Sequence, residues 1–205
     1  LKQKLMGAIA HGHGKYLYVS HSPVITGADF TLECLWRTLL KLESSYLNNN
    51  WTWPPVLNLQ FDNCRDNKNK CVVAFCSLLV ESEIFREVNF NFLMVGHTHE
   101  DIDQMFSTIS RRFLRLCYHP RRKKCVTFKD FVDEINDCFA ANEENAPQCV
   151  EFVAATHDFW GWLGDAIDPK FGNMDGLRSF KFRKQTEEEE NMHLFREFDG
   201  RCVVF

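Results

Sequence analysis

Residues 90–113 read FNFLMVGHTHEDIDQMFSTISRRF, and this stretch combines the two periodicities that decide the fold. Phe90, Phe92 and Met94 recur at period two, which is typical of a half-buried strand. After Gly96 the spacing changes to three and four, which is typical of one face of an amphipathic helix. The apolar face of that helix comprises Ile102, Met105, Phe106, Ile109, Phe113 and Leu116. The stretch therefore predicts a strand, a short turn and a helix.

Three carboxylates, Glu100, Asp101 and Asp103, stand at the start of the predicted helix. A rotation of about 100° per residue places Glu100 away from the apolar stripe, and Asp101 and Asp103 near its two edges. Asp101 follows Thr98 by three residues, as in a capping box, so a structural role explains Asp101 as well. Asp103 lies beyond the capping positions and is the better candidate for a metal ligand.

The turn also contains two histidines, His97 and His99, in an H-x-H pair. Zinc sites usually combine such residues with cysteines or a third histidine, and no such ligand stands nearby in the sequence. We expect His97 to shape the turn or to hydrogen-bond a carboxylate. A zinc site that joins both histidines to a distant cysteine such as Cys64 is a weaker alternative.

The composition sets broad limits on the class of protein. The chain has 205 residues, a formal net charge of -4, nineteen phenylalanines and nine cysteines. This length fits one domain with a generous core, and the net charge provides no global attraction for nucleic acid. Scattered cysteines without a C-x-x-C pair or a signal peptide predict reduced thiols in an intracellular protein. Because no apolar run approaches about eighteen residues, we expect no membrane span.

The other segments complete an α/β pattern. Alternation and turn residues predict a hairpin over 5–20, a strand over 56–61 and a pair of short C-terminal strands over 180–205. Helical spacing predicts further helices over 31–46, 71–80 and 128–139, the first of them capped by Asp29 or Thr31. Short helical crossovers imply parallel pairing after the initial hairpin, and so an α/β sandwich.

Asp62 follows the strand over 56–61 on the same side as Asn58 and Gln60. It therefore stands at the carboxyl end of a strand, where open α/β sheets bind their ligands. An Asx-turn that ends the strand explains Asp62 and Asn63 as well, so both interpretations remain open.

A run of basic residues follows the acid-bearing helix. It comprises Arg111, Arg112, Arg115, Arg121, Arg122, Lys123 and Lys124. Such a cluster is typical of phosphate contacts with a nucleic acid. A solvated helix end, where cations complement the helix dipole, is an equally good interpretation.

Three blocks of the sequence resemble one family. They are GADFTLECLWRTLLKLE (27–43), DNCRDNKNK (62–70) and GHTHEDIDQMFSTISRRF (96–113). These blocks resemble DUF7869, a domain of predicted eukaryotic transposable-element proteins with a ribonuclease-H-like core. The resemblance covers roughly residues 5–118. Its pattern falls here on Asp62, Asn63, Asn67, Lys68, Asn69, Gly96, His97, Thr98 and Asp103.

The resemblance implies a ribonuclease-H-like mixed sheet flanked by helices over residues 1–118, truncated at the N-terminus. Residues 119–205 would then form a small helical and β-hairpin extension. Enzymes of this fold hold two Mg²⁺ or Mn²⁺ ions between three acids, and the ions activate the nucleophile and stabilise the leaving group. Asp62 would be the second acid and Asp103 the third, with Asp101 as its substitute. We expect the first acid on a strand upstream of Leu1, and this chain to be inactive without it.

Two functions from different classes follow from these observations. The first is a nuclear, transposase-like domain that cleaves and transfers DNA strands, with the basic cluster holding phosphates. In that domain Asn63, Asn67, Lys68, Asn69, His97 and Thr98 would shape the site. The second is a domesticated, non-catalytic module that binds nucleic acid or protein. A homo-oligomer is compatible with either function.

Overall fold

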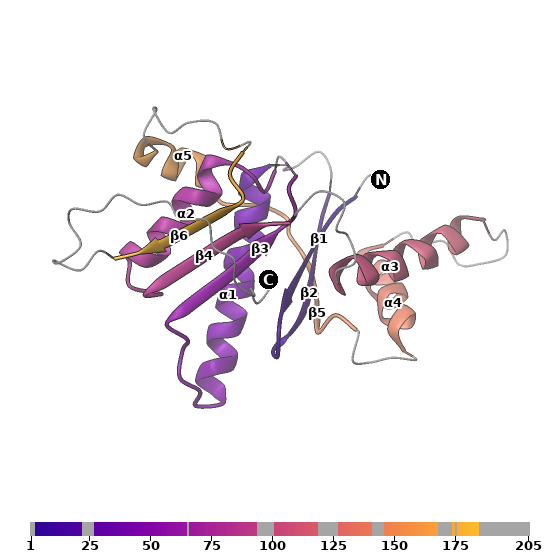
Figure 1. Cartoon of the computed structure of the whole chain (residues 1–205). Helices are drawn as coiled ribbons and strands as arrows, with labels where there is room; N and C mark the ends of the chain where they lie inside the picture. The colour runs from indigo at the N-terminus through magenta and orange to yellow at the C-terminus, as the bar shows by residue number, and fades with distance from the viewer. Residues whose placement is uncertain are drawn as a thin grey trace.

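The computed structural model describes residues 3–21, 27–64, 66–93, 101–118, 127–140, 146–167, 174 and 176–184. These residues form two three-stranded sheets with helices packed against them, so the predicted mixed α/β class is confirmed (Figure 1). The strands are β1 (Gln3–Ala10), β2 (Gly14–His21), β3 (Val56–Phe61), β4 (Glu87–Phe92), β5 (Cys149–Phe152) and β6 (Ser179–Arg183). The α-helices are α1 (Ala28–Asn48), α2 (Lys70–Glu81), α3 (Asp101–Tyr118), α4 (Phe128–Phe139) and α5 (Phe159–Leu163), and a 3₁₀ turn follows over Gly164–Ala166.

The first sheet has the strand order β1-β2-β5. β1 and β2 form the predicted antiparallel hairpin, and Gly12 in its turn has a φ of 79°, a conformation that glycine adopts without a steric cost. β5 pairs in parallel with β2, so a strand from late in the chain closes this sheet.

The second sheet has the strand order β3-β4-β6. β3 and β4 are parallel, as expected for strands connected through a helix, and β6 adds antiparallel to β4. Strands of the predicted C-terminal extension are therefore built into both sheets. The second half of the predicted C-terminal hairpin lies outside the described residues.

Helix α1 packs against both sheets. Its Leu32, Leu35 and Leu39 share a buried cluster with side chains of β3, β4 and α2. Its Phe30 and Cys34 share another cluster with side chains of the β1-β2 hairpin. Because the sheets are not paired with each other among the described residues, α1 is the element that joins them.

The first turn of α1 differs from the prediction. Gly27 occupies the N-cap position, and no side chain caps the helix there. Asp29 instead accepts a hydrogen bond from the Trp160 backbone N–H at 3.0 Å. Thr31 donates its hydroxyl to Asn67 Oδ1 at 2.9 Å. The predicted capping role is therefore wrong, because both side chains have partners in other parts of the fold.

Helices α3 and α4 cover the outer face of the first sheet, where Met105, Ile109 and Ile135 pack on Leu17 of β2. Gly7 of β1 lies directly under α3: a Cβ at this position would lie 2.7 Å from Ile102 Cδ1 and 2.8 Å from Met105 Cε. The close approach of strand and helix therefore depends on a residue without a side chain. Within the described segments, no helix is both long and apolar enough to cross a bilayer.

We expect Gly7→Val to destabilise the protein by about 1–3 kcal/mol, since the new methyl groups would displace α3 from the sheet. Urea unfolding followed by circular dichroism measures this loss. Gly176→Val is the matched control, because a Cβ at Gly176 meets no atom within 4 Å. Equal stability of the two variants would show that α3 is not packed closely on β1.

Candidate functional site

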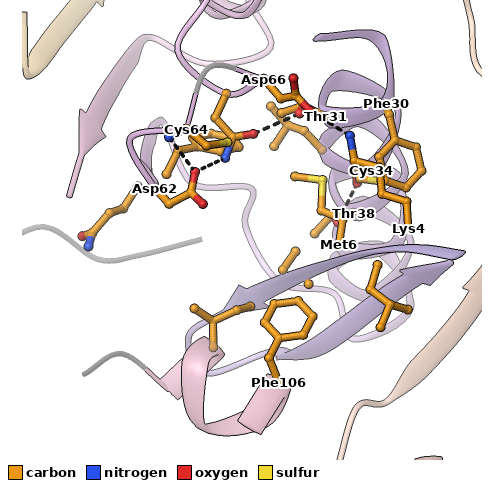
Figure 2. Close-up of a pocket in the computed structure, with 18 of the residues that line it drawn as sticks. Lys4, Met6, Phe30, Thr31, Cys34, Thr38, Asp62, Cys64, Asp66 and Phe106 are labelled. Atoms are coloured by element: carbon orange, nitrogen blue, oxygen red, sulfur yellow. Dashed lines mark hydrogen bonds and ion pairs between the residues drawn. The ribbon is translucent and has the colours of Figure 1, made fainter. Parts of the chain in front are cut away.

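A cavity of about 220 Å³ lies between β1 and β3 (Figure 2). β1 lines it from Lys4 to Ala8, and β3 lines it with its last residues and the adjoining Asp62. Phe30 and Cys34 of α1 and Phe106 of α3 complete the wall. The predicted second acid therefore stands at a cavity that both sheets share.

The edges of β1 and β3 that border this cavity are not paired with another strand in the described part of the chain. The Phe61 carbonyl accepts a hydrogen bond from the Leu93 N–H at 2.9 Å, so the odd-numbered residues of β3 direct their backbone groups toward β4. The backbone N–H and C=O groups of Val56 and Asn58 are consequently directed to the opposite edge of β3. An unpaired strand edge is a template for a further strand.

Asp62 combines a turn-forming role with an available oxygen. Its Oδ1 accepts hydrogen bonds from the Cys64 N–H at 3.1 Å and from Asn67 Nδ2 at 2.6 Å. The first of these bonds is that of an Asx-turn, the structural alternative that the sequence left open. The second carboxylate oxygen is directed away from both donors (Figure 2). Asp62 can therefore hold the turn and still offer an oxygen to a ligand.

The loop after Asp62 accounts for the other family-pattern residues in this region. Asn67 connects Asp62 to Thr31 through its two amide atoms. Asn69 is the N-cap of α2 and accepts from the Val72 N–H at 3.0 Å, which gives it a purely structural explanation. Lys68 places its Nζ 5.2 Å from the centre of the Phe92 ring, and Asn63 is exposed.

An ion pair that the sequence did not predict crosses the cavity. Lys4 Nζ of β1 lies 2.8 Å from Asp66 Oδ2 in the loop after β3. The two residues are 62 positions apart, so no local pattern could have indicated the pair. The contact attaches the loop that carries Asp62 to the first sheet.

The acids of α3 lie in its first turn. Asp101 is exposed and Asp103 is half-buried, while Ile102 and Phe106 of the same helix line the cavity. Over the described ranges, no three His, Cys, Asp or Glu residues are grouped so that they could hold a metal ion. The structure therefore does not bring Asp62 and Asp103 into one complete metal site.

The zinc alternative cannot be placed, because Gly96, His97, Thr98 and His99 lie outside the described residues. Its third member, Cys64, is exposed in the turn after Asp62. Burial and a hydrogen bond with the Asp62 carboxylate raise the pKa of the Cys64 thiol.

The predicted basic cluster is divided in the structure. Arg111 and Arg115 are exposed on α3, whereas Arg112 binds Glu134 of α4 at 2.8 Å and Asp137 at 3.4 Å. Its hydrogen bond to Glu134 raises the pKa of the Arg112 guanidinium. Arg112 thus fastens α3 to α4. Arg121, Arg122, Lys123 and Lys124 lie outside the described residues.

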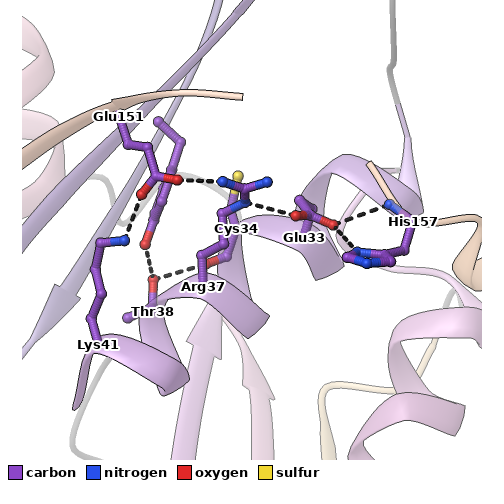
Figure 3. Close-up of polar contacts among 8 residues, drawn as sticks. Glu33, Cys34, Arg37, Thr38, Lys41, Glu151 and His157 are labelled. Atoms are coloured by element: carbon purple, nitrogen blue, oxygen red, sulfur yellow. Dashed lines mark hydrogen bonds and ion pairs between the residues drawn. The ribbon is translucent and has the colours of Figure 1, made fainter. Parts of the chain in front are cut away.

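A second polar cluster surrounds Glu33 in the second turn of α1 (Figure 3). The Glu33 side chain is 1% exposed and accepts from Arg37 Nε at 2.7 Å. The other carboxylate oxygen lies 2.8 Å from His157 Nδ1 and 3.1 Å from the His157 backbone N. Arg37 and Lys41 both bind Glu151 of β5. This network connects α1 to β5, which closes the first sheet, and to the segment after β5 that contains His157.

The environment of Glu33 changes its titration. Burial on its own would raise the pKa of the Glu33 carboxyl, but the hydrogen bonds from His157 and Arg37 outweigh burial and hold the pKa below its ordinary value. A carboxyl with a lowered pKa in the folded state stabilises the protein above the unfolded pKa, and this contribution is lost as the pH falls. No local pattern indicated this site, because Glu33 lies within an apolar helical pattern.

We expect Glu33→Gln to lower the free energy of unfolding at pH 7 by about 1.5–3 kcal/mol, because charged hydrogen bonds are lost. The difference between native and variant should shrink as the pH falls below 4.5, the ordinary pKa of this carboxyl. Urea titrations at several pH values measure both effects. Glu43→Gln, on the exposed side of the same helix, is the control, and a pH-independent difference would contradict the assignment.

One family of proteins covers nearly the whole chain. The model of the domain of unknown function DUF7869 matches residues 1–199. The chain belongs to the DUF7869 family. The match reaches beyond the blocks around Asp62 and includes β5 and β6, which close the two sheets. No curated protein and no solved structure is significantly similar to the chain.

Proposed function

We propose that this DUF7869 domain is a ribonuclease-H-like, transposase-like domain of transposable-element origin. It contributes Asp62 and an acid of α3 to metal-dependent cleavage and transfer of DNA strands, and a nuclear location follows from that role. The observation that carries the proposal is the cavity at Asp62, which is bordered by β1 and β3, each the outermost strand of its sheet within the described ranges.

The strand order supports this proposal. One strand placed between β1 and β3 would pair with both open edges and give a single sheet, β5-β2-β1-strand-β3-β4-β6. The order of elements along the chain is also that of a ribonuclease-H-like core. An antiparallel hairpin comes first, parallel strands linked by helices follow, and an acid-bearing helix comes last. An acid on the added strand would stand beside β3, and therefore near Asp62. We propose that this strand carries the first acid.

The metal site requires these additional groups. Mg²⁺ takes about six oxygen ligands, usually one or two carboxylates with several waters and substrate phosphates. Of the two carboxylates that line the cavity, Asp66 is paired with Lys4, and Asp62 directs one oxygen away from its turn. The residues that the structure describes therefore do not form the site by themselves. Asp103 is the preferred partner from α3 and Asp101 the second choice, as the helical spacing predicted.

We expect Mn²⁺ or Mg²⁺ to bind this chain weakly, and Asp62→Asn and Asp103→Asn each to abolish the heat of binding. Isothermal titration calorimetry measures it, with Asp133→Asn on the exposed side of α4 as the control. Binding that neither substitution changes would refute the shared site. Complete absence of binding would mean that this chain does not hold a metal on its own, which favours the second function below.

The second candidate is a non-catalytic nucleic-acid-binding module of the same fold. Two observations favour it: an oxygen of Asp62 is engaged within its own turn, and Arg111 and Arg115 are exposed on α3. Guanidinium groups on a helix face can bind phosphates without any metal. This function requires the arginines and not the acids.

We expect Arg111→Gln combined with Arg115→Gln to weaken the binding of duplex DNA and to reduce its salt dependence. Two lost phosphate contacts should lower the slope of log K against log salt by about 1.8. Fluorescence anisotropy at several salt concentrations measures the slope. Lys129→Gln on α4 is the matched control, and an unchanged slope in the double variant would remove α3 from the DNA-binding surface.

A further inference from the structure

The exposed apolar side chains of this protein are concentrated in one place. The described residues include nine large hydrophobic side chains with high exposure, and five of these line two cavities of about 390 and 320 Å³. The five are Leu40, Leu47, Trp51, Ile84 and Trp162. Trp36, Leu79 and Ile84 line both cavities, so the two form one continuous groove, called here the tryptophan groove. A contiguous exposed apolar patch marks an interaction site.

One wall of the groove is a second apolar stripe on α1. Trp36, Leu40 and Leu47 recur at helical spacing beside the buried face of α1, and Trp36 itself packs against the buried cluster. The stripe spans eleven helical steps, which corresponds to roughly 16 Å or three helical turns. A groove of this length between helical elements accommodates an amphipathic helix.

The acidic and basic side chains that line the groove are Glu43, Glu83 and His157. The Glu83 carboxylate is paired with Lys184 Nζ, so Glu43 supplies the main acidic charge at the rim. Glu83 has a φ of 59°, and its backbone N–H and that of Ile84 bond to the carbonyls of Val80 and Leu79, as in a Schellman motif. Glycine is favoured at that position, yet a carboxylate stands there at the rim of the groove. A helix with basic side chains beside its apolar residues would complement this rim.

Helix α3 presents such a surface. Arg111, Leu114, Arg115 and Tyr118 fall within an arc of about 100° on its C-terminal half. Leu114 is 54% exposed and Tyr118 is 84% exposed, and both arginines are exposed. α3 projects from the side of the molecule opposite α2 (Figure 1), so this surface cannot reach the groove of its own molecule.

We propose that the C-terminal half of α3 docks in the tryptophan groove of a second copy of this chain. Leu114 and Tyr118 fill the apolar groove, while Arg115 and the neighbouring Arg111 approach Glu43 at its rim. Two copies that exchange this contact form a closed dimer, whereas a one-way contact continues as a chain of molecules. This self-association is independent of the metal chemistry proposed above.

Sedimentation velocity of the whole DNA-free chain over a range of concentrations tests the proposal. We expect a concentration-dependent dimer or larger species, and Arg115→Glu or Glu43→Arg should each weaken self-association at least about tenfold. The double variant Arg115→Glu/Glu43→Arg should recover most of it, because the two reversed charges again attract. A nonspecific effect of net charge would instead move the two single variants in opposite directions, because Arg115→Glu makes the chain more negative and Glu43→Arg makes it less negative.

Controls separate this contact from a loss of folding. Lys129→Glu makes the same change in net charge as Arg115→Glu, and should leave self-association unchanged. Leu47→Ser and Leu114→Ser replace exposed side chains, so both should retain native circular dichroism while weakening the contact. A chain that stays monomeric at every concentration, or an association that none of the groove variants changes, would overturn the proposal.

Discussion

Apolar burial along α1 is the interaction on which the rest of the structure depends. The two sheets share no strand pairing among the described residues, and α1 buries Leu32 and Leu35 against one and Phe30 against the other. Each such side chain contributes about 1.5–3 kcal/mol of transfer free energy. Because α1 packs on both sheets, its side chains also line the cavity at Asp62 and one wall of the tryptophan groove.

The local part of this arrangement could be predicted from the sequence. The β1-β2 hairpin, the parallel β3-β4 pair and helices α1, α2, α3 and α4 all follow from periodicity and turn residues within short windows. The turn at Asp62 was also among the predicted alternatives, since an Asx-turn depends only on neighbouring residues. Such elements depend on residues that are close together in the sequence, so their patterns can be recognised without knowledge of the fold.

The remainder depends on contacts between distant segments. β5 has only four residues, too few for a clear alternation, and its partner β2 lies more than a hundred positions earlier. Glu33 and His157 are separated by 124 positions, and the bond from Trp160 to Asp29 spans 131. These tertiary partners also explain why Asp29 and Thr31 do not cap α1. Only the folded arrangement of the chain reveals them.

The late position of the closing strands has a consequence for synthesis on the ribosome. The ribosome completes β2 long before β5, because the strand that covers the β2 edge is made roughly 130 residues later. At about 5–20 residues per second, that edge stays uncovered for roughly 7–27 s. During this interval the nascent chain exposes strand edges that other nascent chains could pair with. Chaperone engagement in that window would therefore protect the hairpin until its C-terminal partner emerges.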